Sequence, residues 1–331
     1  HTMHHPCCRA LCPVFFLFVF LTAGPPAWAA AAPAIAGCPL LPPDNIWNAP
    51  VDTLPIAAQS AAYIDTIGRT TTLHPDFGSG TWDGGPIGIP YNVVEAGQGM
   101  ATVSFLYADE SDPGPYPIPA APLIEGGPDA DGDRHILIID RDACRLYELY
   151  DARPETSTSW TAGSGAIYDL RANTLRPDGW TSADAAGLPI LPGLVRYEEV
   201  AGGAVNHALR FTAAHTRNTH LWPARHHASS LAGAQYPPMG QRFRLKAGVD
   251  TSGFSPPVQV ILRAMQKYGL ILADNGSDWY ISGAPDERWD NDILRELNLL
   301  SGNDFEAVDV SGLILHPDSG QLLVAESRLG E

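Results

Sequence analysis

Glycine and proline interrupt this chain along its whole length, with 32 and 30 copies respectively in 331 residues. Both residues mark turns and end regular elements, so their spacing favours many short strands and ordered loops over a helical bundle. Strand-like runs recur between these breaks, at residues 101–107, 134–140, 145–150, 208–212, 241–246 and 270–273. We therefore predict a mainly β protein with a single-domain β-sandwich, jelly-roll or barrel-like core.

A few peripheral helices are expected around that core. The clearest covers residues 256–268, where Ser255 can cap the helix, Pro256 suits its first turn and Gly269 suits its end. Shorter helices are predicted at residues 59–67 and 290–299. The long loop at residues 109–133 is expected to cover a site, since loops of that length are uncommon in compact domains unless they do.

The first 29 residues predict export. Residues 14–22 (VFFLFVFLT) have the length of a signal-peptide core, and the following Ala27-Trp28-Ala29 is a cleavage site of the A-x-A type. The run is too short for a membrane anchor, which needs roughly 20 apolar residues. We expect residues 1–29 to be a signal peptide, residues 30–331 to form one secreted β-rich domain, and no membrane association after cleavage.

The cysteines agree with an extracellular or periplasmic location. Three of the five leave with the signal peptide, and Cys38 and Cys144 remain. Two cysteines in an exported chain most simply form one disulfide, and the alternative is two buried free thiols.

The formal net charge of −17 restricts the partners. Nucleic acids and anionic membranes attract basic surfaces, so both are disfavoured, and highly anionic polysaccharides are disfavoured more weakly. Neutral polysaccharides and oligosaccharides remain open, and we expect the protein to be a monomer.

The common nucleophile and cofactor motifs are missing from the sequence, which leaves acids and histidines near glycine-rich turns as candidates. There is no G-x-S-x-G elbow, no H-E-x-x-H helix and no P-loop. In the small-residue segment 179–190, Asp184 is a candidate general acid or base and Trp180 a candidate stacking surface for a sugar. The alternative is that Ser182 or Asp184 caps a turn.

Two further acids could complete a catalytic pair. Asp274 and Asp169 each end a strand-like run, a position that equally suits an Asx turn. Glycoside hydrolysis needs two carboxyl groups, and the separation between them decides between retaining and inverting chemistry. His207 is a candidate acid/base partner, with a satisfied structural histidine as the alternative. Arg210, in the strand-like run that follows His207, and the aromatic Trp279 are candidate substrate contacts.

No cofactor is required by this chemistry, but two metal sites are candidates. Asp129, Asp131 and Asp133 resemble a fragment of a calcium loop without its downstream glutamate, and the alternative is an ordinary acidic turn. His215, His220 and His226 form the second candidate, for a divalent metal, although their spacing fits no established motif.

Several segments spread over the chain resemble a family of exported bacterial proteins to which we assign no activity. They are 44–48 (DNIWN), 131–135 (DGDRH), 179–190, 222–226 (WPARH), 238–246 (PMGQRFRLK) and 274–283. The resemblance implies one coherent domain and assigns no catalytic residue.

These observations lead to three hypotheses. The first is a secreted glycoside hydrolase that uses Asp184 with Asp274 or Asp169 on a polysaccharide. The second is a non-catalytic glycan-binding or cell-envelope protein, and the third is a metal-dependent hydrolase.

Overall fold

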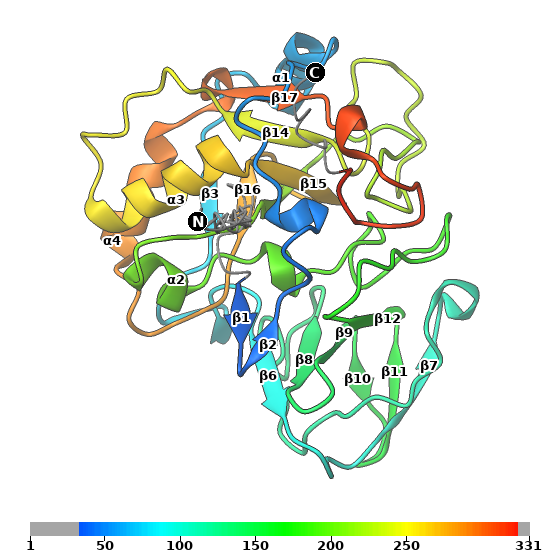
Figure 1. Ribbon diagram of the computed structural model, residues 1–331. Helices are drawn as coiled ribbons and strands as arrows, with labels where there is room; N and C mark the ends of the chain where they lie inside the picture. The colour runs from blue at the N-terminus through cyan, green and yellow to red at the C-terminus, as the bar shows by residue number, and fades with distance from the viewer. Residues whose placement is uncertain (1–32, 324–331) are drawn as a thin grey trace, which may run out of the picture.

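The computed structural model describes residues 33–323, and the predicted signal peptide lies outside this range. Among these residues, 28% are in strands and 17% in helices, so the described part of the protein is mainly β. Two groups of strands pack together: a six-stranded sheet with most of the helices forms the upper part of Figure 1, and two smaller sheets form the lower part. The described residues contain mixed sheets and no closed barrel, which confirms a sandwich-like core and removes the barrel alternative.

The six-stranded sheet has the order β17-β14-β15-β13-β16-β3. β13 and β15 are entirely or almost entirely buried and run parallel, as expected for strands covered on both faces. The chain crosses between β14 and β15 through helix α3 (Pro256–Lys267), which packs against β14. The strand bounds are β3 His74–Asp76, β13 Leu209–Ala213, β14 Arg242–Leu245, β15 Leu270–Asn275, β16 Tyr280–Ser282 and β17 Phe305–Val308.

The lower part contains a four-stranded sheet, β12-β9-β8-β6, and a three-stranded sheet, β10-β11-β7. β8 and β9 form an antiparallel hairpin whose buried residues belong to the two larger hydrophobic clusters of the described residues. The bounds are β6 Tyr91–Val94, β7 Thr102–Phe105, β8 Ile136–Asp140, β9 Arg145–Tyr150, β10 Arg153–Pro154, β11 Ser159–Ala162 and β12 Ser164–Asp169. Two short ribbons complete the strands: β1 Ala34–Ile35 with β2 Cys38–Pro39, and β4 Thr81–Trp82 with β5 Gly85–Pro86.

The predicted helices are confirmed with small changes at their ends. α1 covers Ser60–Ile67, α3 ends one residue earlier than expected, and the third helix is α4 (Asn291–Leu294) followed by a 3₁₀ turn, Arg295–Leu299. A further short helix, α2, covers Tyr197–Ala201. Ser255 begins α3 without a side-chain cap, because its hydroxyl is bound to Glu296.

The predicted disulfide forms between Cys38 in β2 and Cys144 just before β9, with a Cα–Cα distance of 5.3 Å. It ties the first described ribbon to the β8–β9 hairpin across 106 residues. No helix within residues 33–323 is long and apolar enough to cross a membrane.

Trp279 is the centre of the upper core, which corrects its assignment as a substrate contact. Its side chain is fully buried, stacks on Phe211 and Phe305, and meets Phe243 edge-on. An indole enclosed on both faces by other rings has no face left for a sugar.

Candidate functional site

A cleft of about 740 Å³ opens between the edge strand β3 and the loop that leads into β8. One wall comes from β3, β16 and the β4–β5 ribbon, and the other from residues 125–133. Residues of α4 and the following 3₁₀ turn close one side. The long loop at 109–133 therefore contributes to a cleft, as its length suggested.

Aromatic side chains line this cleft. The side chain of Trp82 in β4 is 80% exposed, although tryptophan is usually buried for most of its surface. Tyr280 stacks on His74 with ring centroids 4.1 Å apart and an angle of 26° between the planes. Exposed aromatic faces beside polar groups suit recognition of a ligand that has an apolar face and a polar rim.

Glu125, Asp133 and His135 meet at the loop wall of the cleft. Each offers one ligand atom, and these atoms all lie within 4.8 Å of one another. Nε2 of the buried His135 lies 2.9 Å from the carbonyl oxygen of Ala183, and Nδ1 lies 2.5 Å from Oε2 of Glu125. Because a carbonyl only accepts hydrogen bonds, Nε2 carries a proton and Nδ1 faces the acids.

The Glu125–His135 pair is electrostatically coupled. Burial lowers the pKa of His135, but the charge of Glu125 outweighs burial and raises that pKa to about 9. For Glu125, desolvation raises the pKa, and the imidazolium of His135 reverses this and holds it below the ordinary value. Glu125 is therefore a carboxylate stabilised in its ionised form.

Arg210 in β13 connects acids from neighbouring segments. Its guanidinium binds Asp184 through two hydrogen bonds of 2.6 and 2.7 Å, and it donates to Asp274 in β15 at 3.1 Å. A further bond of 2.6 Å reaches Ser282 in β16. β13 lies between β15 and β16 in the sheet, so the strand order itself brings these side chains together.

Asp184 and Asp274 differ in their access to solvent. The side chain of Asp184 has no exposed surface, whereas that of Asp274 is 21% exposed. Desolvation raises the pKa of Asp274 well above its ordinary value, the negative charge of Asp184 raises it further, and Arg210 lowers it in part. Asp274 is thus an accessible carboxyl group that tends to keep its proton, and Asp184 is a positioning residue behind it.

The Arg210 network and the Glu125–His135 pair belong to one electrostatic neighbourhood. Arg210 lowers the pKa of both Asp274 and Glu125, although other groups have a larger effect on each. The pKa of Tyr150 is raised first by burial and then by the charges of Asp133, Asp151 and Asp274. The Tyr150 ring lies 5.8 Å from the His135 ring.

Glu148 in β9 is a fully buried acid behind this neighbourhood. Its carboxylate accepts hydrogen bonds of 2.9 to 3.0 Å from the backbone N–H groups of Ile190 and Leu191. Desolvation raises its pKa to about 7 in spite of those bonds. It anchors residues 190–191 to the lower sheet, six residues beyond Asp184.

Comparison with protein-family models, curated proteins and solved structures gives no match for this chain. The resemblance to exported bacterial proteins therefore stays an interpretation. The arguments about function rest on the geometry of the cleft and its surroundings.

Three of the predicted site residues, Asp184, Asp274 and Arg210, lie together, and others lie elsewhere. Asp169 is an exposed turn acid at the end of β12, where it accepts the backbone N–H of Arg171 at 2.9 Å. His207 is fully buried and bound to Glu199 at 3.2 Å and to the carbonyl of Ala208 at 2.8 Å, which corresponds to the structural alternative. Trp180 lies outside the cleft lining, with its ring 5.5 Å from the guanidinium carbon of Arg176.

The predicted metal residues are also rearranged. Asp131 and Asp133 line the cleft and Asp129 does not, and the described group with converging ligand atoms is Glu125, Asp133 and His135. Among the histidines, His220 and His226 each stack near His227, with centroids 6.0 and 5.8 Å apart. His215 instead lies 6.4 Å from Tyr236, so the three predicted histidines do not form one site.

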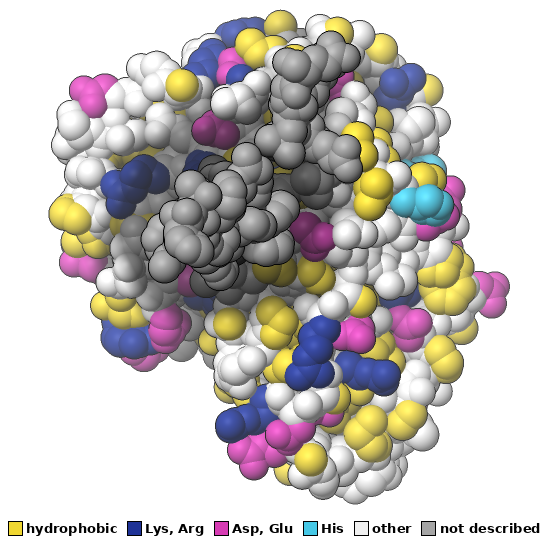
Figure 2. All heavy atoms as spheres, viewed as in Figure 1, with side chains coloured by type: hydrophobic (Ala, Val, Ile, Leu, Met, Phe, Trp, Pro, Cys, Tyr) yellow, Lys and Arg dark blue, Asp and Glu magenta, His cyan; other side chains and the backbone are white. Residues whose placement is uncertain are grey.

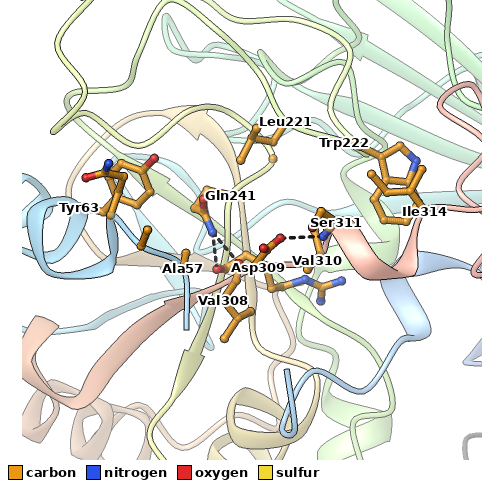
Figure 3. A pocket seen from close by; sticks show the side chains of 14 residues that line it. Ala57, Tyr63, Leu221, Trp222, Gln241, Val308, Asp309, Val310, Ser311 and Ile314 are labelled. Atoms are coloured by element: carbon orange, nitrogen blue, oxygen red, sulfur yellow. Dashed lines mark hydrogen bonds between the residues drawn. The ribbon is translucent and has the colours of Figure 1, made fainter. Parts of the chain in front are cut away.

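A smaller pocket of about 250 Å³ lies beside β14 and β17, at the end of the six-stranded sheet opposite β3 (Figure 3). Its polar groups are used internally: the Gln241 amide donates to the carbonyls of Arg242 and Val308, and Asp309 accepts the backbone N–H of Ser311. The remaining wall is apolar, with Leu221, Trp222 and Ile314 at one side. This pocket offers no group for acid–base chemistry comparable to the cleft.

On the coloured part of the face drawn in Figure 2, which holds the described residues, acidic and basic side chains are interspersed without one extended basic area. This agrees with the acidic balance of the sequence. Nothing on that face favours a polyanionic partner.

Proposed function

We propose that the protein is a glycan-cleaving enzyme, a glycoside hydrolase that binds a polysaccharide or oligosaccharide in the 740 Å³ cleft. The observation that carries the proposal is a cleft lined by aromatic side chains and by Glu125, which binds His135 at 2.5 Å, together with the partly exposed Asp274 held by Arg210 at 3.1 Å. The pKa of Asp274 is raised well above its ordinary value, and the pKa of Glu125 is held below its own ordinary value. Both acids are influenced by Arg210 and His135, and opposite pKa shifts of two such acids match the pattern that assigns an acid and a base or nucleophile.

In this proposal Asp274 supplies the proton to the glycosidic oxygen as the bond to the leaving sugar breaks. Glu125, ionised beside His135, either activates water or attacks the anomeric carbon. Asp184 and Arg210 hold Asp274 in place, and Trp82 and Tyr280 offer stacking faces to the sugar rings. This keeps Asp274 from the original prediction and replaces the buried Asp184 by Glu125 as its partner.

A metal-dependent hydrolase is the second candidate, favoured by the convergence of Glu125, Asp133 and His135. The His135 Nε2–H bound to the Ala183 carbonyl is the kind of outer contact that orients metal-binding imidazoles. A divalent cation there would replace the proton now shared by His135 and Glu125.

The test is the release of reducing ends from a panel of glycans by the wild type, Asp274→Asn and Glu125→Gln, with and without a chelator. Loss of a general acid or its partner lowers rates by about 10² to 10⁴. The matched control is Asp169→Asn, which removes an acid at a strand end outside the cleft and keeps its turn contact. Activity that survives chelation and disappears in both Asp274→Asn and Glu125→Gln supports the acid pair.

Loss of activity on chelation would move the function to the metal-dependent candidate. Activity unchanged in Asp274→Asn would refute the proposed acid. Binding without cleavage of any glycan would favour a non-catalytic glycan-binding protein.

A further inference from the structure

The charges that line the cleft are almost all negative. Five acids, Asp76, Asp83, Glu125, Asp131 and Asp133, face one cationic side chain, Arg295, which already pairs with Asp292. Glu125 pairs with His135. Asp76, Asp83, Asp131 and Asp133 have no ion-pair partner within residues 33–323.

These unpaired acids stand on both walls. Asp76 ends β3 and Asp83 lies in the β4–β5 turn, whereas Asp131 and Asp133 belong to the opposite loop. A bound sugar chain would have acids on two sides. A cleft whose charges all have one sign concentrates ligands of the opposite charge and repels ligands of the same charge.

The same cleft holds the aromatic faces. Trp82 is the neighbour of Asp83 in the chain and is 80% exposed, and Tyr280 shares the cleft with Asp76 on the paired strands β16 and β3. Stacking faces recognise the ring of a sugar, and adjacent carboxylates recognise a cationic substituent on it. A neutral sugar would partly desolvate these carboxylates without providing an opposite charge.

We propose, on the basis of the glycan-cleaving function above, that the substrate is a cationic glycan, a polymer of amino sugars with free amino groups. The protonated amines lie against Asp83 and Asp131 while the sugar rings stack on Trp82 and Tyr280. N-acetylation removes the charge of the substrate, and uronic acids reverse it. Both changes weaken binding in this cleft.

The experiment compares a hexamer of β-1,4-linked glucosamine with its fully N-acetylated counterpart. The pH is about 6, below the usual pKa of an amine, so that the free amino groups are protonated. Binding is measured by calorimetry and cleavage by product analysis, for the wild type, Asp83→Asn and Asp131→Asn. The matched control is Asp109→Asn, which removes an exposed charge outside the cleft. All titrations contain a chelator, so that an effect through bound calcium is excluded.

We expect the free amine to be preferred, and each cleft variant to lower that preference about three- to fivefold, the size of one Coulomb contact across a hydrated cleft. Asp109→Asn should leave the preference unchanged. Raising the salt from about 0.01 M to 1 M should reduce the preference, because the screening length falls from about 30 to 3 Å.

An equal or stronger preference for the N-acetylated hexamer would overturn the inference. So would a preference that is insensitive to Asp83→Asn and Asp131→Asn. Cleavage of neutral glycans alone would overturn it and leave the hydrolase proposal standing. Charge-dependent binding of the glucosamine hexamer without any cleavage would support the ligand class and refute the hydrolase.

Discussion

Asp184→Asn separates the two roles that the Arg210 network plays, in stability and in the protonation of Asp274. The Asp184 carboxylate has no exposed surface and accepts both of its short bonds from Arg210. Asparagine has nearly the same shape and no charge. The change leaves the buried guanidinium with Asp274 as its remaining acid, at 3.1 Å.

The expected loss of unfolding free energy is about 3 kcal/mol, the lower end of the range for breaking a buried ion pair, because Asp274 compensates in part. The second effect concerns pH. The charge of Asp184 raises the pKa of Asp274, so its removal lowers that pKa. A general acid works only while protonated, and the alkaline limb of kcat/KM should therefore move to lower pH in the variant.

Urea unfolding at neutral pH measures the first effect, with the m-value checked for an unchanged unfolding transition. The pH profile of glycan cleavage measures the second, with Asp169→Asn as the control in both assays. A stability loss below about 1 kcal/mol would show that the pair is not the buried contact described, given the usual cost of breaking one. An alkaline limb that stays in place or moves up would refute Asp274 as the acid.

Three other predictions concern the disulfide, the tryptophans and the His135 pair. Cys38→Ser with Cys144→Ser should lower the unfolding free energy by about 4 to 5 kcal/mol, the chain-entropy value for a loop near 100 residues, measured by urea unfolding against the oxidised wild type. Trp279→Ala should cost about 3 to 5 kcal/mol as a core truncation, whereas Trp82→Ala should leave the melting temperature unchanged and weaken glycan binding by about 1 kcal/mol in calorimetry. The raised pKa of His135, about 9 against an ordinary 6.5, makes its stabilisation complete below pH 6.5 and lost as the pH rises through 9. The stability difference between wild type and His135→Gln should therefore shrink on raising the pH from 6 to 10, and a constant difference would contradict the protonated pair.

Local features of the sequence were sufficient to predict the elements. The run at residues 145–150 is β9 with the same bounds, and residues 256–268 contain α3. The disulfide followed from counting cysteines in a chain with a predicted export signal. These predictions succeed because each depends only on nearby residues in the chain or on the predicted compartment. None of them requires the order of the strands in the sheets.

The site could be predicted only in part, because it depends on which strands become neighbours. Arg210 and Asp274 were each recognised as candidates, but their contact follows from the parallel pairing of β13 with β15, 64 residues apart. Glu125 and His135 were missed, since one is a single acid in a proline-rich loop and the other the start of an apolar strand. The length of the loop that carries Glu125 was the signal that could have located them.

Two buried arginines in the same sheet show why the Arg210 network points to function. Arg242 in β14 is fully buried and donates to two backbone carbonyls, those of Tyr268 and Ile46. Desolvation lowers its pKa to about 9, and no acid within residues 33–323 is placed to oppose this. Arg242 thus joins segments of backbone and serves the fold.

Arg210 lies two strands away, across β15, and its pKa is raised because carboxylates outweigh its desolvation. A buried ion network stabilises a fold no better than well-packed apolar side chains would, so stability alone does not explain three ionisable groups at this position. Departures from simple core packing are expected where a site is built. Here the departure leaves one carboxyl group, that of Asp274, partly accessible and inclined to keep its proton, as the proposed acid catalysis would require.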